Sequence, residues 1–375
     1  MNLYNISPFF FLSCIVVLCV LFTGCTDLLL IDGNIRYQQQ PTSVQYTIEY
    51  GYTIECKGTG EYELSYLCDL PSVVQGSIAS TLPLYAQFYR EIMIHNNSVF
   101  KWNISGDTDA TYTLGVSSAV QSTTLYVADL NGERALTTSQ IRQQYADLVE
   151  QYCRTQSVDD VLYINPDDQA ITEKAHAIRR QENTDNSFLL AKALFVWLKT
   201  NFSYCVHPEN PNVQTALETF NKENMYCSGD CDDLSFLYIS MCRALNIPAR
   251  FIRGYLITSS EGMPSIGPHA WAEVFVGGNL GNQGWIPVEC ACTADYTSNI
   301  HQNFGVEDVS HLRLFVDDGS DDALAHSLSS VSWTYVPGME ITAESFVHVE
   351  QYMVLNQQQL VISKDGIRSY ETPAS

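Results

Sequence analysis

The segment that most constrains this chain spans residues 226–255 and reads YCSGDCDDLSFLYISMCRALNIPARFIRGY. Five of its apolar residues recur at helical spacing: Leu234, Leu237, Tyr238, Met241 and Leu245. This period predicts one amphipathic helix over about residues 231–245, capped by Ser228 or Asp230. Cys231 then lies in the first turn, where unpaired backbone N–H groups and the helix dipole stabilise a negative charge. A thiol forms a thiolate most easily at such a position.

The segment holds two further cysteines, for which we expect structural roles. Cys242 stands beside Met241 on the side of the helix that faces the core. Cys227 precedes the cap, in a loop, and is better placed for a disulfide than for catalysis. Within this segment, chemistry is therefore expected of Cys231.

A nucleophilic thiol needs a base, and the base needs a group that orients it. Three strand-like runs follow the helix, separated by turn signals: ARFIRGYLI, PHAWAEVFV and GWIPVEC. His269 begins the second run and Glu289 ends the third. Neighbouring antiparallel strands would bring these two side chains together beside the N-terminus of the helix. Three further histidines, His311, His326 and His348, have acidic or irregular surroundings and are expected at the surface.

The blocks GDCDDLSFLYISMCRALNIPARFIRGY, HAWAEVF and GWIPVE, in this order, resemble the motifs of the transglutaminase-like cysteine hydrolases over roughly residues 170–300. The resemblance implies an α+β fold with a papain-like core, in which a helix carrying the cysteine packs on an antiparallel sheet. It implies Cys231 as nucleophile, His269 as general base and then acid, and Glu289 as the carboxylate that orients the imidazole. The family more often has Asp at this last position, and Asp295 is the alternative carboxylate. No cofactor or metal is implied.

The resemblance also implies the reaction. The Cys231 thiolate would attack an amide carbonyl, and the oxyanion would become a thioester as His269 protonates the departing amine. The Cys231 backbone N–H is the first expected oxyanion donor, and Tyr204 is the candidate for the second, with a core or hairpin tyrosine as the other interpretation. Water as acceptor gives hydrolysis and an amine gives cross-linking. Exported prokaryotic members are more similar to peptidases or amidases, so we expect protein or wall-peptide substrates.

An apolar run, PFFFLSCIVVLCVLFTGC, opens the chain. At about 17 residues it suits a signal peptide better than a spanning helix of about 20. Its end, residues 21–25, resembles a prokaryotic lipobox, although no Lys or Arg precedes it. Cleavage before Cys25 and lipidation of its thiol would tether the protein to the outer face of the membrane. An uncleaved anchor is the alternative, and both place the rest of the chain outside the cell.

Composition and pattern suggest the remaining organisation. A chain of 375 residues exceeds one typical domain. Residues 1–25 are the expected signal or anchor, 26–135 an all-β domain resembling a sandwich, 136–300 the catalytic domain and 301–375 a β-rich extension. The formal net charge of -23 argues against nucleic acid as a partner.

Export changes how the cysteines are interpreted, because most thiols pair in an oxidising exterior. Cys56 and Cys68 are candidates to join one hairpin of the β-domain. Two alternatives to catalysis remain open at this stage. In the first, Cys231 forms a disulfide with Cys227, and the protein binds another protein or wall polymer without catalysing a reaction. In the second, a zinc ion is held by four thiolates: Cys227, Cys231, Cys290 and Cys292. The acidic loop at residues 316–322 could bind calcium, but it lacks the ligand spacing of an EF-hand. A solvated loop without an ion is therefore the favoured interpretation.

Overall fold

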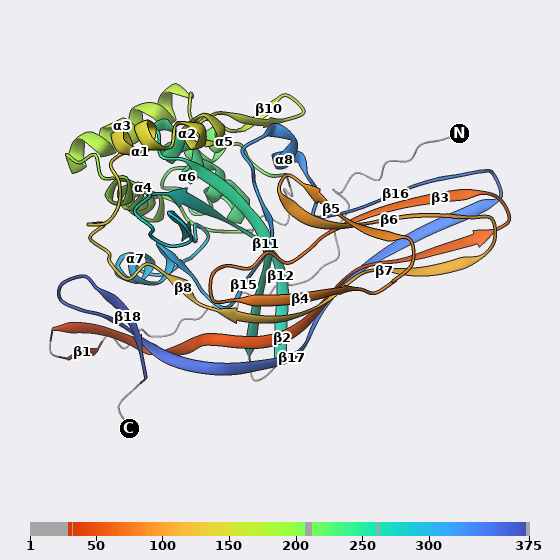
Figure 1. Ribbon diagram of the computed structural model, residues 1–375. Helices are drawn as coiled ribbons and strands as arrows, with labels where there is room; N and C mark the ends of the chain where they lie inside the picture. Colours follow the sequence, from red (N-terminus) through yellow and green to blue (C-terminus); the bar gives the residue numbers. More distant parts are fainter. Residues whose placement is uncertain (1–28, 32, 207–211, 261–262, 373–375) are drawn as a thin grey trace.

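The structure is a computed structural model that describes residues 29–31, 33–206, 212–260 and 263–372. The expected signal segment and the lipidation site Cys25 lie outside these residues. Within the described part, no helix has the length and apolar character needed to cross a membrane. Figure 1 shows the helices gathered at one end of the molecule, with long strands extending away from them.

The longest strands form one antiparallel sheet in the order β18-β17-β2-β7-β4, with β1 paired to β2. The strand bounds are β1 Leu29–Ile31, β2 Asn34–Gly58, β4 Ile78–Pro83, β7 Ala110–Thr123, β17 Met339–Ile362 and β18 Arg368–Glu371. Along much of β2, buried and more exposed side chains alternate, as expected for a strand with one face on a core.

A second antiparallel sheet has the order β16-β3-β6-β5. Its strands are β3 Tyr62–Asp69, β5 Tyr89–Ile94, β6 Asn97–Gly106 and β16 Ser329–Tyr335. Residues of both sheets pack into one hydrophobic core, with Tyr46 and Ile48 from β2 and Leu64 and Trp102 from the second sheet. The expected all-β region is therefore present. Cys56 and Cys68 are buried in it as free thiols, so the predicted hairpin disulfide is wrong.

The predicted catalytic core is built on a third antiparallel sheet, in the order β13-β12-β11-β15. Its strands are β11 Ala249–Ser260, β12 Met263–Phe275, β13 Trp285–Val288 and β15 His311–Val316. Two short strand pairs complete the β structure: β8 Leu125–Tyr126 with β14 Val306–Glu307, and β9 Gln156–Val158 with β10 Val161–Ile164.

Helix α6, Cys231–Ala244, packs against β11 and β12 and is surrounded by α3, α4 and α5. The other helices are α1 Thr138–Gln144, α2 Ala146–Tyr152, α3 Gln169–Glu182, α4 Ser187–Asn201, α5 Ala216–Phe220, α7 Tyr296–Asn303 and α8 Asp321–Ala325. The helix predicted over residues 231–245 and the α+β class are both confirmed. Cys242 is fully buried in this core, in agreement with its predicted structural role.

The segment after residue 300 contributes to all three sheets. β15 joins the third sheet, β16 pairs with β3, and β17 pairs with β2 along almost its whole length. A boundary at residue 300 therefore divides the third sheet, and the C-terminal strands complete the two large sheets of the β-region. The side chains of the acidic loop stabilise its turn. Asp317 accepts a hydrogen bond from the Gly319 backbone N–H, and Asp318 accepts one from the Ser320 backbone N–H.

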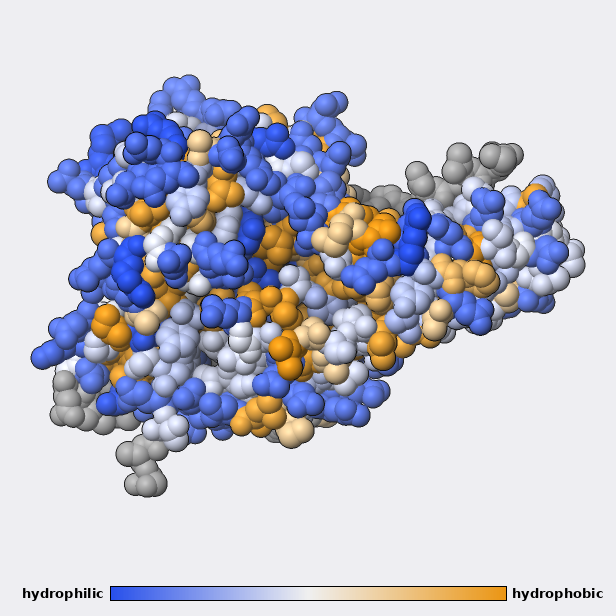
Figure 2. Space-filling model, in the orientation of Figure 1, coloured by the Kyte–Doolittle hydropathy of each residue, from blue (hydrophilic) through white to orange (hydrophobic). Residues whose placement is uncertain are grey.

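The surface differs between the two ends of the molecule. Figure 2 shows mainly hydrophilic residues over the helices, and hydrophobic residues gathered where β4 and β5 cross the visible face. The exposed large side chains of these two strands include Ile78 and Leu82 of β4 and Met93 of β5. The acidic composition therefore coexists with local apolar surface on the β-region.

A buried ion network ties β11, β12, β14 and β15 together. The Arg313 guanidinium donates to Glu307 and, at 2.5 Å, to Glu273. Arg250 donates to Glu273 at 2.6 Å, and the Trp271 indole donates to Glu307 at 3.1 Å. Burial alone would raise the pKa of Glu273, but Arg313 and Arg250 outweigh it and lower that pKa to about 2. Both carboxylates therefore depend on Arg313 for compensation of their buried charge.

We predict that Arg313→Met lowers the free energy of unfolding by about 3–5 kcal/mol, because it leaves the buried Glu307 without a cationic partner and Glu273 with Arg250 alone. Urea denaturation at pH 7 measures this. The matched control is Arg36→Met, which removes the exposed ion pair with Glu371 and should change stability by less than about 1 kcal/mol. Equal effects of the two substitutions would contradict the network's role.

The same network predicts an acid dependence. The pKa of Glu273 is lower in the folded chain than its ordinary value of 4.5, so its ionisation stabilises the fold above pH 4.5. This contribution is lost as the pH falls from 4.5 toward 2. Denaturation at several pH values should show this loss in the wild type and a smaller loss in Arg313→Met.

Candidate active site

The start of α6 is built to present Cys231. Asp230 is the N-cap and accepts the Asp232 backbone N–H at 3.2 Å. Asp233 accepts the Asp230 backbone N–H at 3.1 Å, which completes a capping box. A Cβ at Gly229 would lie 2.6 Å from the Asp233 Cβ, so only glycine fits immediately before this cap. Cys231 is therefore the first helical residue, as the sequence predicted.

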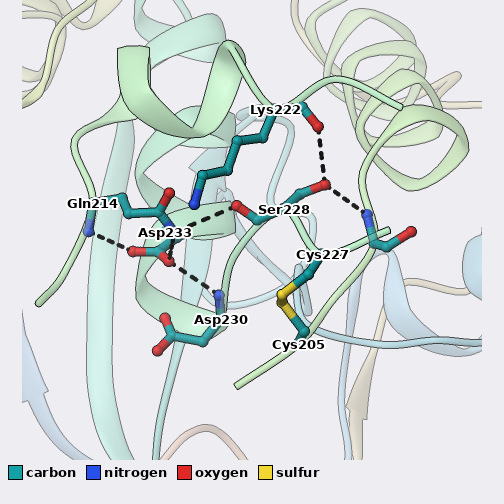
Figure 3. The surroundings of a disulfide bond; sticks show 8 residues. Cys205, Gln214, Lys222, Cys227, Ser228, Asp230 and Asp233 are labelled. Carbon is teal, nitrogen blue, oxygen red and sulfur yellow. Dashed lines mark hydrogen bonds between the residues drawn. A yellow bond between two sulfur atoms is a disulfide. The ribbon is translucent and has the colours of Figure 1, made fainter. Parts of the chain in front are cut away.

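A disulfide fixes the loop that leads to the helix. Figure 3 shows Cys205 joined to Cys227, with Ser228 beside the bond. The Ser228 hydroxyl donates to the Lys222 carbonyl at 3.2 Å and accepts the Ser203 backbone N–H at 3.1 Å. The prediction that Cys227 forms a disulfide is confirmed, and its partner is Cys205. The loop is thus tied both to the end of α4 and to the turn after α5.

This disulfide overturns both alternatives that used Cys227 differently. Cys227 is not joined to Cys231, which is a free thiol. The four-thiolate zinc site is also wrong, since Cys227 has no thiolate to offer. The remaining two proposed ligands make local hydrogen bonds: the Cys290 thiol donates to the Val288 carbonyl at 3.7 Å, and the Cys292 thiol to Asn299 at 2.7 Å.

The sheet brings His269 and Glu289 together. His269 lies on β12, and Glu289 directly follows β13, the strand antiparallel to it. The His269 Nε2 and the Glu289 Oε2 are 2.6 Å apart. Both side chains are about nine-tenths buried, with 9% and 11% exposed. The other Glu289 oxygen, Oε1, accepts the Ala291 backbone N–H at 2.6 Å, so the carboxylate is held at both oxygens.

A second histidine, missed from the sequence, reaches the same carboxylate. The His311 Nε2 lies 2.9 Å from the Glu289 Oε2, and its Nδ1 lies 2.9 Å from an Asp308 oxygen. The prediction that His311 is a surface residue is wrong, since its side chain is only 7% exposed. His326 is likewise buried and paired with Asp69, whereas His348 is 46% exposed. The acidic residues near His311 in the sequence predicted a solvent-exposed position, but one of them, Asp308, is its hydrogen-bond partner.

Opposite charges set the ionisation of this group. Burial would raise the pKa of Glu289, but His269 and His311 outweigh it and hold that pKa well below its usual range. Burial would lower the pKa of His311, but Asp308 and Glu289 raise it to about 10. At neutral pH, Glu289 is therefore an anion and His311 a cation.

The thiol itself departs from the sequence-based expectation. Burial, followed by the Asp232 and Asp230 carboxylates, raises the pKa of Cys231 well above its usual value, and the Ala270 backbone N–H only partly opposes this. Burial also raises the pKa of Asp232, to about 7. The helix dipole favours a thiolate, as predicted, but the two acidic neighbours and burial outweigh it. The resting residue is accordingly a thiol.

The thiol and the imidazole share no hydrogen bond among the described residues. The Cys231 Sγ lies 4.0 Å from the Asp232 Oδ1. Glu289 occupies the His269 Nε2, so Nδ1 is the ring nitrogen that remains to take a proton. Proton transfer requires a hydrogen bond between the thiol and this nitrogen, which catalytic pairs often form only with substrate bound.

Two further candidates have defined positions. The Tyr204 backbone forms a bridge with Gly229, and its partly buried side chain packs against the core around α6, close to the loop before Cys231. Asp295 is the N-cap of α7 and bonds to Ser298, so it is not the partner of His269. Ligand atoms of His269, Glu289 and His311 all lie within 4.8 Å of one another, which makes these three the metal-capable group of the described residues.

Comparison with known proteins found one family match and several similar solved structures. A model of the transglutaminase-like superfamily matches residues 173–290. No match was found among curated proteins. A solved candidate cysteine protease from Cytophaga hutchinsonii is similar, with 15% identity and a TM-score of 0.49 over 89% of this chain and 99% of that chain. The periplasmic domain of TgpA from Pseudomonas aeruginosa bound to ethylmercury has 14% identity and a TM-score of 0.32, over 71% and 94% of the two chains.

The family match spans the helix that begins at Cys231, the strand that carries His269, and Glu289. It lies inside the range of residues 170–300 expected from the three motif blocks. Residues 173–290 of this chain thus match the transglutaminase-like superfamily.

Proposed function

We propose that this protein is a transglutaminase-like cysteine peptidase or amidase that acts on amide bonds of proteins or wall peptides outside the cell. The observation that carries the proposal is the 2.6 Å contact between Glu289 and His269 of β12, a strand that packs against α6, whose first residue is Cys231. A thiol, an imidazole and an orienting carboxylate are the parts that nucleophilic amide cleavage needs.

In the proposed reaction the Nδ1 of His269 takes the Cys231 proton as the sulfur attacks the carbonyl carbon. The carbonyl oxygen becomes an oxyanion, for which the Cys231 backbone N–H and Tyr204 are the proposed donors. Collapse breaks the C–N bond, His269 returns its proton to the amine, and a thioester remains. Water, deprotonated by His269, then releases the acid and restores the thiol.

This sequence of steps suits the high pKa of the thiol. Because Cys231 is protonated at rest, the base must remove the proton during attack rather than before it. Glu289 is anionic and stabilises the imidazolium that forms at that moment. We favour water over an amine as acceptor by analogy with exported prokaryotic members of the family.

Export is part of the same proposal. The disulfide between Cys205 and Cys227 is the kind of bond that persists in an oxidising compartment. Together with the apolar N-terminal run, it supports a protein held at the outer face of the cytoplasmic membrane through Cys25 or an uncleaved anchor. The partners would be a protein or peptide substrate and the membrane, and not nucleic acid.

We predict that Cys231→Ala and His269→Ala each reduce hydrolysis by about 10³-fold or more, since triad members act as a unit. The full-length protein would be incubated with a quenched fluorescent peptide library and with wall peptides. Thermal melting would check that both variants remain folded. The matched control is Cys242→Ala, a buried cysteine of the same helix outside the site, which should keep its turnover per folded molecule. Wild-type activity in folded Cys231→Ala would contradict the proposal.

We predict that alkylation of Cys231 is slow at neutral pH and accelerates up to and beyond pH 9, because the pKa of the thiol is raised. Asp232→Asn removes a neighbouring negative charge, so it should lower this pKa and speed labelling at pH 8 by about 3-fold to 10-fold.

Peptide mass spectrometry measures this rate for Cys231 specifically. Asp322→Asn, at an exposed position on α8, serves as the charge-matched control and should leave the rate unchanged. A labelling rate that is already maximal below pH 7 would show a preformed thiolate and contradict the electrostatics described above.

A further inference from the structure

The proposed mechanism leaves one pair of side chains next to the site without a role. His311 and Asp308 are joined at 2.9 Å, and His311 contacts the same Glu289 oxygen as His269. This oxygen therefore receives two imidazoles, at 2.6 Å and 2.9 Å. A hydrogen bond to the orienting carboxylate places His311 one step from the base.

Hydrogen-bond chemistry determines the protonation of His311. A neutral imidazole has one N–H donor, whereas an imidazolium has two. Carboxylate oxygens lie at both ring nitrogens of His311, from Asp308 on one side and Glu289 on the other. Both contacts can be made only if both nitrogens carry protons, so His311 donates to each carboxylate as a cation. Its raised pKa agrees with this assignment.

Glu289 has a particular need for such a donor. Glutamate has one more rotatable bond than the aspartate usual in this family, so its carboxylate can adopt more positions. The Ala291 N–H holds Oε1, while Oε2 must point at His269. His311 approaches Oε2 as a second donor and restricts the remaining rotation. The positive charge of His311 also weakens the electrostatic attraction of Glu289 for the proton on His269. The contribution of His311 is therefore to orient Glu289 rather than to strengthen its charge.

The sheet is shaped to bring His311 this close. β11 lies between the strands of the two histidines, and Gly254 of β11 pairs with His269 on one side and with Arg313 on the other. A Cβ at Gly254 would lie 1.9 Å from the Leu312 carbonyl oxygen. Any side chain there would push β15, and His311 with it, away from the site. The Trp271 ring packs edge-on against His311, with centroids 4.8 Å apart, and limits the ring's movement.

We propose that Asp308 and His311 are a positioning pair that fixes Glu289 against His269. In addition to the thiol, the site then contains a hydrogen-bonded chain of four side chains: His269, Glu289, His311 and Asp308. The effect on turnover rests on the proposed function, but the effect on the His269–Glu289 contact does not. Metal binding by His269, Glu289 and His311 is the competing use of the same atoms. The cationic state of His311 argues against it, because a metal ligand needs a nitrogen lone pair.

The first test measures the contact itself, without turnover. In the ¹⁵N-labelled full-length protein, the imidazole N–H of His269 bound to Glu289 should give a slowly exchanging resonance, assigned by its loss in His269→Ala. His311→Leu should broaden or abolish this resonance, because Glu289 is then free to rotate. Asp308→Asn should weaken it, and His311→Gln should retain it better than His311→Leu, since the amide can still donate.

The matched control is His326→Leu, which removes another buried histidine paired with a carboxylate, Asp69, outside this chain of side chains. It should leave the His269 resonance unchanged. An unaltered resonance and exchange rate in both His311→Leu and Asp308→Asn would overturn the proposal. A resonance that appears in the wild type only after a chelator is added would also overturn it, in favour of a metal site.

The second test uses turnover. His311→Leu should lower kcat by about 10-fold to 100-fold, the size of effect known for groups that orient metal-ligating histidines, with little change in KM. In a Glu289→Ala background the same substitution should have less than about 2-fold effect, because His311 acts through Glu289. Equal losses in both backgrounds would identify a general structural role and overturn the proposal.

The two tests separate the two proposals. If Cys231→Ala hydrolyses peptides as well as the wild type while the His269 resonance still depends on His311, the proposed function fails and the positioning pair stands. If Cys231→Ala is inactive and the His269 resonance is unchanged in His311→Leu and Asp308→Asn, the proposed function stands and the proposed positioning pair fails.

Discussion

The pairing of β11 with β12 is the interaction on which the rest of the structure depends. Its register runs from Ala249 opposite Val274 to Ser260 opposite Met263. One end of this hairpin lies under α6 and contributes Phe251 to the helical core. Further along, it contributes Ile257 to the core shared by the two large sheets. A single pair of strands thus belongs to both hydrophobic cores and joins the helical part to the β-region.

Acidic side chains concentrate around the thiol and give the site its character. Asp230 and Asp233 cap α6, and Asp232 lies beside Cys231. These carboxylates stabilise the helix N-terminus but oppose a negative charge on sulfur. A helix start that is favourable for folding is therefore unfavourable for a free thiolate. Under the proposed mechanism, deprotonation by His269 during attack reconciles the two requirements.

Burial makes the surrounding polar groups depend on one another. Glu289 keeps its charge in a nearly dry position because two imidazoles and a backbone N–H donate to it. Arg313 of β15 compensates the buried negative charges of Glu273 and Glu307 in the same manner. Removing one member of such a group exposes the others to the full cost of desolvation. The site therefore stands on a sheet in which the buried carboxylates Glu273 and Glu307 are held by Arg313.

The sequence by itself determined the local structure around Cys231 and the set of residues that could do chemistry. Helical spacing predicted α6 to within a residue or two, and three ordered motif blocks predicted the superfamily and the α+β class. These features depend on near neighbours in the chain, where periodicity and capping act directly. Only the tertiary structure decided the partners that lie far apart in sequence: Cys205 for Cys227, His311 for Glu289, and the C-terminal strands for β2 and β3. Such pairings depend on which strands become neighbours, and burial then reverses what a residue's local context suggests, as it does for the pKa of Cys231 and the position of His311.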